Sequence, residues 1–146
     1  MVRLPATVHG KGDHGFVPEL ISIARATGVS GYLGDGSNHW PAVHRYDAAR
    51  LFTAALQQAP AGARFHGVAE EGVLLRDIAE VIGRHLRLRV RAIAPEDAAG
   101  HFGWLAGFLA ASVVASSVLT QKQLGWHPGE IELIPDLDEG HYFQDR

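Results

Sequence analysis

The residues best suited to chemistry in this sequence are histidines, because an imidazole can carry a proton or bind a metal near neutral pH. The chain has nine of them and no cysteine. His9 and His14 are five residues apart, as are His39 and His44, in stretches that we expect to be loops or short strands. No His-x3-His pair or His-Glu motif places two ligands on one helix face, so the sequence predicts no metal site.

Two other reactive patterns are absent from the sequence. Ser112, Ser116 and Ser117 lie in an apolar stretch, and the chain contains no G-x-S-x-G turn of the kind that serine hydrolases use. The loop from Gly10 to Gly15 contains Gly-Lys-Gly-Asp, whereas a phosphate-binding loop ends in Gly-Lys-Ser or Gly-Lys-Thr. We therefore expect neither a serine hydrolase nor a phosphate-binding loop of this type.

A third pattern, Gly28-x-x-Gly31-x-x-Gly34, has the glycine spacing of a dinucleotide-binding loop. Such a loop works only between a strand and a helix, because the N-terminus of the helix holds the pyrophosphate. Here a polar turn cluster and then Trp40-Pro41 follow, and these cannot begin a long helix at that point. We interpret the motif as a turn, a strand and a second turn.

The elements that must position these residues alternate between short strands and helices, which is typical of an α/β fold. The expected helices begin near Phe16, directly after Asp47 and at Leu74, and they end at Gly28, before Pro60 and at Leu86. The expected strands are 2–4, 30–33, 40–44, 64–68 and 88–93, with a turn at 70–72. We expect Asp47 to cap its helix, a ligand role being the alternative, and Glu80 to pair with Arg84.

Composition limits the remaining possibilities. With 146 residues, 47% of them hydrophobic and 20% charged, the chain is expected to form one globular domain. A net charge of -3 without a basic block gives no sign of a nucleic-acid surface. The segment 103–119 carries no charge, but it is shorter than the roughly 20 residues of a membrane span, so we expect a buried or subunit-interface helix. No signal peptide is visible, and we expect a cytoplasmic protein without membrane partners.

Four segments, in this order, resemble the second half of extended short-chain dehydrogenase/reductases, the NAD-dependent epimerase/dehydratase family. They are Arg3-Leu4-Pro5-Ala6-Thr7-Val8-His9-Gly10, Val43-His44-Arg45-Tyr46-Asp47-Ala48-Ala49-Arg50, Phe65-His66-Gly67-Val68-Ala69 and Leu124-Gly125-Trp126-His127-Pro128. The stretch from Gly34 to His44 is similar to the G-D-G-x-N-x-W-P-A-V-H of a group of small bacterial oxidoreductases.

The resemblance implies the C-terminal portion of a Rossmann-like, doubly wound sheet together with the small, mainly helical substrate-binding subdomain. Residues 1–146 would form a single incomplete domain, in which late Rossmann elements are interleaved with that subdomain. By the same resemblance, the cofactor-binding positions are Pro5 and Thr7, and the substrate-binding positions are His9, Asn38, Trp40 and His44. Two of these have structural alternatives, since Trp40 could be a core residue and His44 a buried structural histidine.

The family's catalytic pair, Tyr-x3-Lys, is missing from this chain. The lysine lowers the pKa of the tyrosine, which exchanges a proton with the substrate. Four residues after Tyr32, Tyr46 and Tyr142 stand Gly36, Arg50 and Arg146. We therefore assign no catalytic residue, and we expect the pair and the cofactor loop to lie N-terminal to residue 1 in the complete enzyme.

The resemblance thus predicts the substrate-binding part of an NAD(P)-dependent oxidoreductase or epimerase acting on a carbonyl or hydroxyl carbon. Alone, the chain should be inactive and should bind NAD or NADP weakly. The alternative is a stand-alone binding or dimerisation module, because half a Rossmann sheet exposes an edge strand and an apolar face. The expected partners are a small-molecule substrate and either the missing N-terminal half or a second copy of the chain.

Overall fold

The computed structural model describes residues 1–144, and it has the α/β fold that the sequence predicts. The strands are β1 (Val2–Arg3), β2 (Thr7–His9), β3 (Val29–Leu33), β4 (His39–His44), β5 (Phe65–His66), β6 (Glu70–Leu74) and β7 (Arg89–Ile93). The α-helices are α1 (Phe16–Thr27), α2 (Arg45–Gln58), α3 (Leu75–Leu86), α4 (Ala98–Phe102), α5 (Ala106–Leu109), α6 (Val118–Leu124) and α7 (Leu133–Asp138). Short 3₁₀ helices occupy Pro95–Asp97, Gly103–Leu105 and His141–Phe143.

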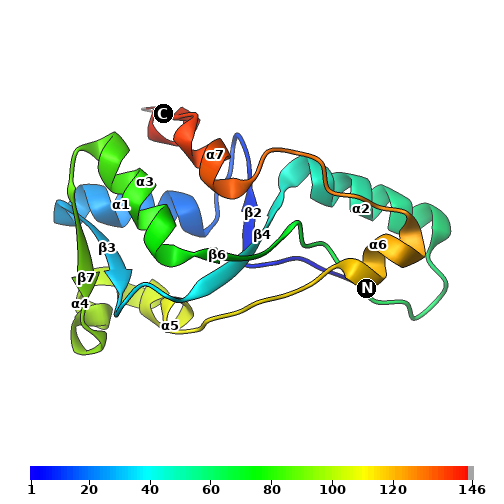
Figure 1. Cartoon of the computed structure of the whole chain (residues 1–146), viewed down its shortest axis with the longest axis horizontal. Helices are drawn as coiled ribbons and strands as arrows, with labels where there is room; N and C mark the ends of the chain where they lie inside the picture. The colour runs from blue at the N-terminus through cyan, green and yellow to red at the C-terminus, as the bar shows by residue number, and fades with distance from the viewer. Residues whose placement is uncertain (145–146) are drawn as a thin grey trace.

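The strands form three small sheets. β1 and β5 pair in parallel, β3 and β7 pair in parallel, and β4 lies between β2, to which it is parallel, and β6, to which it is antiparallel. Figure 1 shows β2, β4 and β6 near the middle of an elongated molecule. The β3–β7 pair lies toward one end with α1, α3 and α4, while α2 and α6 lie at the other end.

Two hydrophobic cores correspond to these two ends. The larger core packs α1 against α3 and β3, and its fully buried members include Val17, Ile78 and Leu133. The smaller core lies under α2 and contains Leu51 and Phe65. Because α7 contributes Leu133 to the larger core, the C-terminal segment is held against the same side of the molecule as α3.

Glycine positions explain the end of α1 and the outcome for the glycine-rich motif. Gly28 has a φ of 72°, a left-handed conformation that costs glycine little, and its N–H bonds to the carbonyl of Ala24. β3 begins directly after Gly28, and Gly34 follows its end in a turn. The motif is therefore a helix end, a strand and a turn, and the prediction that no helix begins within it is confirmed.

Two predicted elements are wrong. Residues 70–72 were expected to form a turn, but they belong to β6, because pairing with β4 stabilises an extended conformation that local sequence does not favour. Segment 103–119 is not one helix. After α5 the chain is extended, and it donates backbone hydrogen bonds from Val113 to His39 (2.8 Å) and from Ala115 to Glu71 (3.1 Å). No helix within residues 1–144 is long and apolar enough to cross a membrane.

The predicted ion pair on α3 is also wrong, because both of its members have other partners. Glu80 accepts a hydrogen bond from Arg76, one turn earlier, at 3.1 Å. Arg84 reaches Asp138 on α7 at 2.6 Å. The surface of α3 therefore contributes to holding the C-terminal segment in place.

Candidate functional site

An apolar pocket of about 280 Å³ lies where the chain leaves β1 and β5. Its walls are mainly carbon: Leu4, Pro5, Trp40, Pro41, Val68 and Phe108 line it, with Arg3 and His66 as polar members. We call it the apolar pocket. In α/β folds, ligands bind beyond the carboxyl ends of parallel strands, and Leu4, Pro5 and Val68 follow the ends of β1 and β5 in that position.

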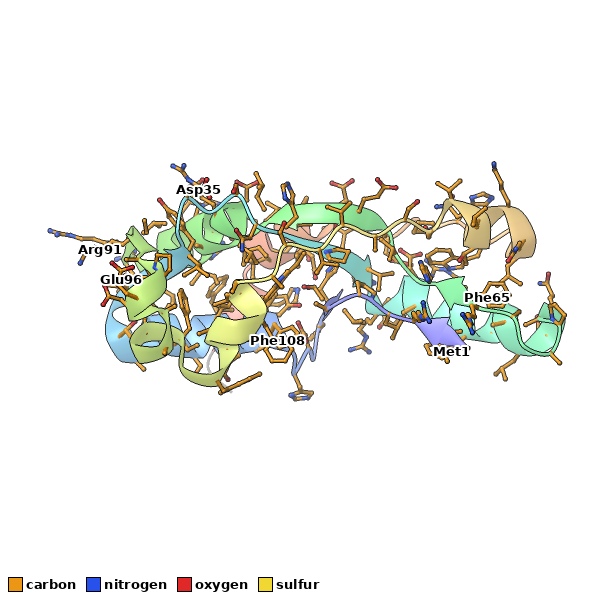
Figure 2. All side chains as sticks on the ribbon, turned by 90° about the horizontal axis from the view of Figure 1, so that it is seen from below. Met1, Asp35, Phe65, Arg91, Glu96 and Phe108 are labelled. Atoms are coloured by element: carbon orange, nitrogen blue, oxygen red, sulfur yellow. The ribbon has the colours of Figure 1, made fainter. Side chains whose placement is uncertain are left out.

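The apolar pocket is open to solvent, and two of the large hydrophobic side chains that line it are exposed. Leu4 is 41% exposed and Phe108 is 51% exposed. Figure 2 shows Phe108 and Met1, near the N-terminal strand, along the same side of the molecule. Apolar side chains that are grouped and exposed in this way are typical of a surface that binds a ligand or another polypeptide.

Three of the six predicted site residues are in or beside the apolar pocket. Pro5 and Trp40 line it directly, and Trp40 is at the same time a core residue with 2% exposure that packs on Phe16. Asn38 does not line the pocket. Its side-chain Nδ2 donates to the carbonyl of Leu109 at 2.7 Å, and it therefore fixes the end of the helix that carries Phe108.

The other three predicted residues, Thr7, His9 and His44, lie within the β2–β4–β6 sheet and are buried. His44 is also the N-cap of α2, because its Nδ1 accepts a hydrogen bond from the backbone N–H of Tyr46 at 3.3 Å. The structure thus divides the six positions between an open pocket and a closed interior, and it does not bring them together around one cavity.

We call a second group of residues the histidine cluster: it consists of the buried His9, His44 and Asp136 and the partly exposed Glu70 and His141. His9 Nδ1 lies 2.7 Å from Asp136 Oδ2, and Asp136 Oδ1 lies 2.9 Å from His141 Nε2. The second nitrogen of His9, Nε2, lies 4.0 Å from Glu70 Oε2. A buried carboxylate on α7 therefore joins a β2 histidine to a histidine near the C-terminus.

Burial and hydrogen bonding shift the pKa values of these groups in opposite directions. Burial lowers the pKa of His9, although the bond to Asp136 favours its protonated form. Burial would raise the pKa of Asp136, but hydrogen bonds from His9 and His141 outweigh it and hold that pKa below its ordinary value. Burial raises the pKa of Glu70, against a hydrogen bond from the backbone N–H of Leu133.

Tyr142 lies next to the histidine cluster and forms hydrogen bonds to the loop that follows β2. The hydroxyl of Tyr142 donates a hydrogen bond to Asp13 Oδ2 at 2.9 Å, and it accepts a hydrogen bond from the backbone N–H of Gly10 at 3.0 Å. Burial is the main cause that raises the pKa of Tyr142, and the neighbouring carboxylate of Asp13 adds to it. This tyrosine is therefore a neutral structural anchor for the loop after β2.

Asp47 is not the helix cap that the sequence predicts, because His44 occupies that position. Its buried carboxylate instead accepts hydrogen bonds from the backbone N–H groups of Gly129 and Glu130, both at 3.0 Å. Its backbone carbonyl accepts from Trp126 Nε1 at 2.9 Å. Asp47 therefore fastens the segment after α6 to the start of α2, as a structural residue.

Sequence reasoning missed Glu70 and Asp136. Glu70 was placed in a turn, and Asp136 lies 127 residues from the histidine that it contacts. Asp136 lies in a short helix, and a lone carboxylate there is also typical of an exposed side chain, so nothing in the local sequence singles it out.

Comparison with known proteins gives two curated relatives. No family model matches the chain. Uncharacterized protein C2A9.02 of Schizosaccharomyces pombe is 50% identical over 143 residues, which are 98% of this chain and 48% of that protein. Uncharacterized protein YLL056C of Saccharomyces cerevisiae is 48% identical over 137 residues, covering 94% of this chain and 46% of that protein. The chain thus spans about half the length of the curated relatives it matches.

Solved structures of a dehydratase and of two epimerases share the fold. The dTDP-glucose 4,6-dehydratase DesIV of Streptomyces venezuelae, with NAD and TYD bound, has a TM-score of 0.70 at 19% identity over 97% of this chain and 42% of that chain. An epimerase of Methanothermobacter thermautotrophicus has a TM-score of 0.72 at 17% identity over the same shares. The UDP-glucose 4-epimerase of Thermotoga maritima, with UDP-glucose, has a TM-score of 0.67 at 16% identity over 97% and 44%. The chain therefore has the fold of part of the NAD-dependent epimerase/dehydratase structures.

Proposed function

We propose that this chain is the substrate-binding part of an NAD(P)-dependent oxidoreductase or epimerase that acts on a carbonyl or hydroxyl carbon. The observation that carries the proposal is the apolar pocket at the carboxyl ends of β1 and β5, with Pro5 and Trp40 in its wall. A pocket at this position in an α/β fold is where a cofactor and a substrate meet. Its largely apolar wall suits the uncharged face of a nicotinamide or of a sugar-like ring.

In this proposal the rest of the enzyme is a second half that supplies the cofactor loop and the proton-transfer residues. Within the part that the structure describes, β1 has two residues and one partner, β5. Since a two-stranded parallel pair of this length buries little, the free edge of β1 is suited to pair with a further strand. Relatives about twice as long supply enough chain for that second half.

The predicted site residues take different roles in the proposal. Pro5 contacts the nicotinamide, and Trp40 forms the wall against which the substrate lies. Asn38 positions Phe108 by holding Leu109, and so acts indirectly. The loop at Pro5 is held in place by β2, which begins two residues later and pairs with β4. This pairing involves Thr7, His9 and His44, so these three residues act on the pocket indirectly.

The test is NAD(H) titration calorimetry on this chain alone and in a mixture with the unmatched half of the Schizosaccharomyces pombe relative. We expect no measurable binding by the chain alone and clear binding by the mixture. The unmatched half alone is the control, because it shows whether this chain contributes to the affinity. Tight binding by the chain alone would overturn the proposal and would redirect attention to the Gly28–Gly34 segment.

A second function, a stand-alone dimerisation module, is favoured by a separate observation. Trp104 is 63% exposed and Leu119 is 72% exposed, and both lie outside the apolar pocket lining. Sedimentation velocity across a concentration series distinguishes the two functions. The split-enzyme proposal expects a monomer that forms a one-to-one complex with the second half, whereas the module expects a dimer that the second half does not dissociate.

A further inference from the structure

Strand pairing places the two polar members of the apolar pocket side by side in its wall. β1 and β5 run in parallel, with Val2 beside Phe65 and Arg3 beside His66. Successive side chains on a strand point to opposite faces. Because Val2 and Phe65 pack in the smaller core, Arg3 and His66 are directed to the other face, where both line the apolar pocket.

Arg3 gives the apolar pocket a positive charge that its lining does not balance. The guanidinium of arginine stays charged at physiological pH. Among the described residues, no aspartate or glutamate lines the pocket. Within residues 1–144, the side chain of Arg3 has no hydrogen-bond or ion-pair partner. His66 differs, because its Nδ1 donates to the carbonyl oxygen of Ser116 at 3.3 Å. Arg3 is therefore available to an anion that enters the pocket.

Phe108 forms an aromatic wall of the apolar pocket that is exposed and nevertheless held in position. Its ring centroid lies 5.2 Å from that of Phe16 and 5.8 Å, edge-on, from that of Trp104. The helix that carries it is fixed by the hydrogen bond from Asn38 to the carbonyl of Leu109. A ring that is already held by its neighbours loses little freedom when a ligand packs on it, and this favours binding.

The cation and the aromatic wall come from different elements, β1 and α5. Figure 2 shows Met1, at the start of the chain segment that forms β1, and Phe108 at separate places along the same side of the molecule. Apart from Arg3 and His66, the lining of the pocket is apolar. A volume of about 280 Å³ is small for a ligand site and suits a body of about one ring. A ligand that satisfies both features has an apolar body and a single negative group.

We propose that the apolar pocket binds an organic anion, with its apolar body against Phe108 and its carboxylate or phosphate group at Arg3. A guanidinium forms paired, charge-assisted hydrogen bonds with either group. The apolar walls strengthen this attraction, because they lower the local dielectric constant. The inference rests on the proposed function for one point, that the pocket is the substrate site. It names the substrate class, which is an acid or a phosphate ester with an apolar body.

The test is calorimetric titration of the whole chain with four probes that share a phenylpropyl body. Two are anions, 4-phenylbutanoate and 3-phenylpropyl phosphate, and the others are the neutral 3-phenylpropan-1-ol and the cationic 3-phenylpropylamine. We expect at least one anion to bind about tenfold more tightly than the alcohol, and the amine to bind most weakly. The anion that binds more tightly identifies the head group. An alcohol that binds as tightly as both anions, or no binding of either anion at millimolar concentration, would overturn the proposal.

Variants distinguish recognition by Arg3 from a general effect of charge. Arg3→Gln should lower the affinity for the anions about tenfold and leave that for the alcohol unchanged. Arg64→Gln is the matched control, because Arg64 carries the same charge two residues before His66 and does not line the apolar pocket. Phe108→Ala should weaken all four probes, since it removes the wall for their shared body. Circular dichroism verifies that each variant is folded. Equal losses in the two arginine variants would contradict the proposal.

The NAD(H) titration of the mixture separates this inference from the proposed function. Binding of NAD(H) by the mixture, with no preference of the chain for the anionic probes, would overturn the substrate class alone. A preference for the anions that Arg3→Gln abolishes, without NAD(H) binding by the mixture, would contradict the proposed function. In that case the apolar pocket would remain an anion-binding site of another kind of protein.

Discussion

The apolar pocket and the histidine cluster are two distinct regions of the molecule, and they differ in how completely their side chains are covered. The apolar pocket is lined by exposed carbon, with Leu4 and Phe108 facing solvent. The histidine cluster is largely buried, and most of its polar atoms already have partners inside the chain. An exposed apolar surface is stabilised when a binding partner covers it. Buried polar groups are instead satisfied by one another within the chain. We therefore expect binding partners at the apolar pocket and contributions to stability at the histidine cluster.

The largest effect is expected where the apolar pocket and the core share a residue. Trp40→Ala should destabilise the fold by about 4 kcal/mol, because it removes a fully buried indole and leaves a cavity. Trp104→Ala is the matched control and should change stability by less than about 0.5 kcal/mol, since that side chain is exposed. Urea unfolding monitors both. Equal effects would mean that the wall of the apolar pocket does not belong to the core.

The histidine cluster should respond almost as strongly. Asp136→Ala should cost about 3 kcal/mol, because it leaves the ring N–H groups of His9 and His141 without their acceptor. Asp138→Ala, two residues along the same helix, removes a carboxylate that contacts only the exposed Arg84 and His85, and should have a much smaller effect. Urea denaturation at neutral pH compares the two. A similar loss for both variants would contradict a special role for the buried carboxylate.

A change at the rim of the apolar pocket should affect docking and not folding. Leu4→Asp should weaken binding of the unmatched half of the relative at least tenfold, or about 1.4 kcal/mol, with little change in stability. Leu56→Asp is the control, because Leu56 is 88% exposed on α2 and away from the pocket lining. Calorimetric titration with the unmatched half measures both. If Leu56→Asp were the more damaging change, the docking surface would lie on α2.

The smallest expected effect concerns His101, and it tests whether burial of this side chain makes the stability of the fold depend on pH. His101 on α4 packs beside Gly31, and its Nε2 has no hydrogen-bond partner among the described residues. Burial lowers the pKa of His101 below the 6.5 expected in the unfolded chain, so the unfolded state takes up a proton first as the pH falls. The stability that depends on neutral His101 is present above that value and is lost below it.

The measurement compares wild type with His101→Gln by urea unfolding from about pH 7.5 to about pH 5.5. We expect the wild type to lose more stability over this range than the variant does. Parallel losses would show that His101 remains hydrated and does not report on burial.

Local sequence was sufficient to predict the elements whose signals are local. The end of α1 at Gly28 follows from a glycine placed directly after a periodic apolar run. Strand β6 was missed because its conformation depends on pairing with β4. The break in segment 103–119 was missed because its extended part is held by backbone bonds to His39 and Glu71, which are distant in sequence.

The candidate site follows the same division. Pro5 and Trp40 were predicted by resemblance, and the structure places both in one pocket wall. The partners of His9 could not be predicted, because neither Glu70 nor Asp136 belongs to a spacing pattern with it. Their contact is a product of sheet register and of the position of α7, and both of these exist only after tertiary folding.

The bond between His9 and Asp136 also has a consequence for the order of events during synthesis. This bond joins residues that are 127 positions apart. Closing so long a loop has an entropic cost, which is offset only after the intervening elements have packed. On the ribosome, β2 and β4 can pair long before α7 emerges, and during that interval His9 lacks its carboxylate partner. The C-terminal segment is therefore the last to pack around His9, and until it does so the incompletely folded chain can be bound by chaperones.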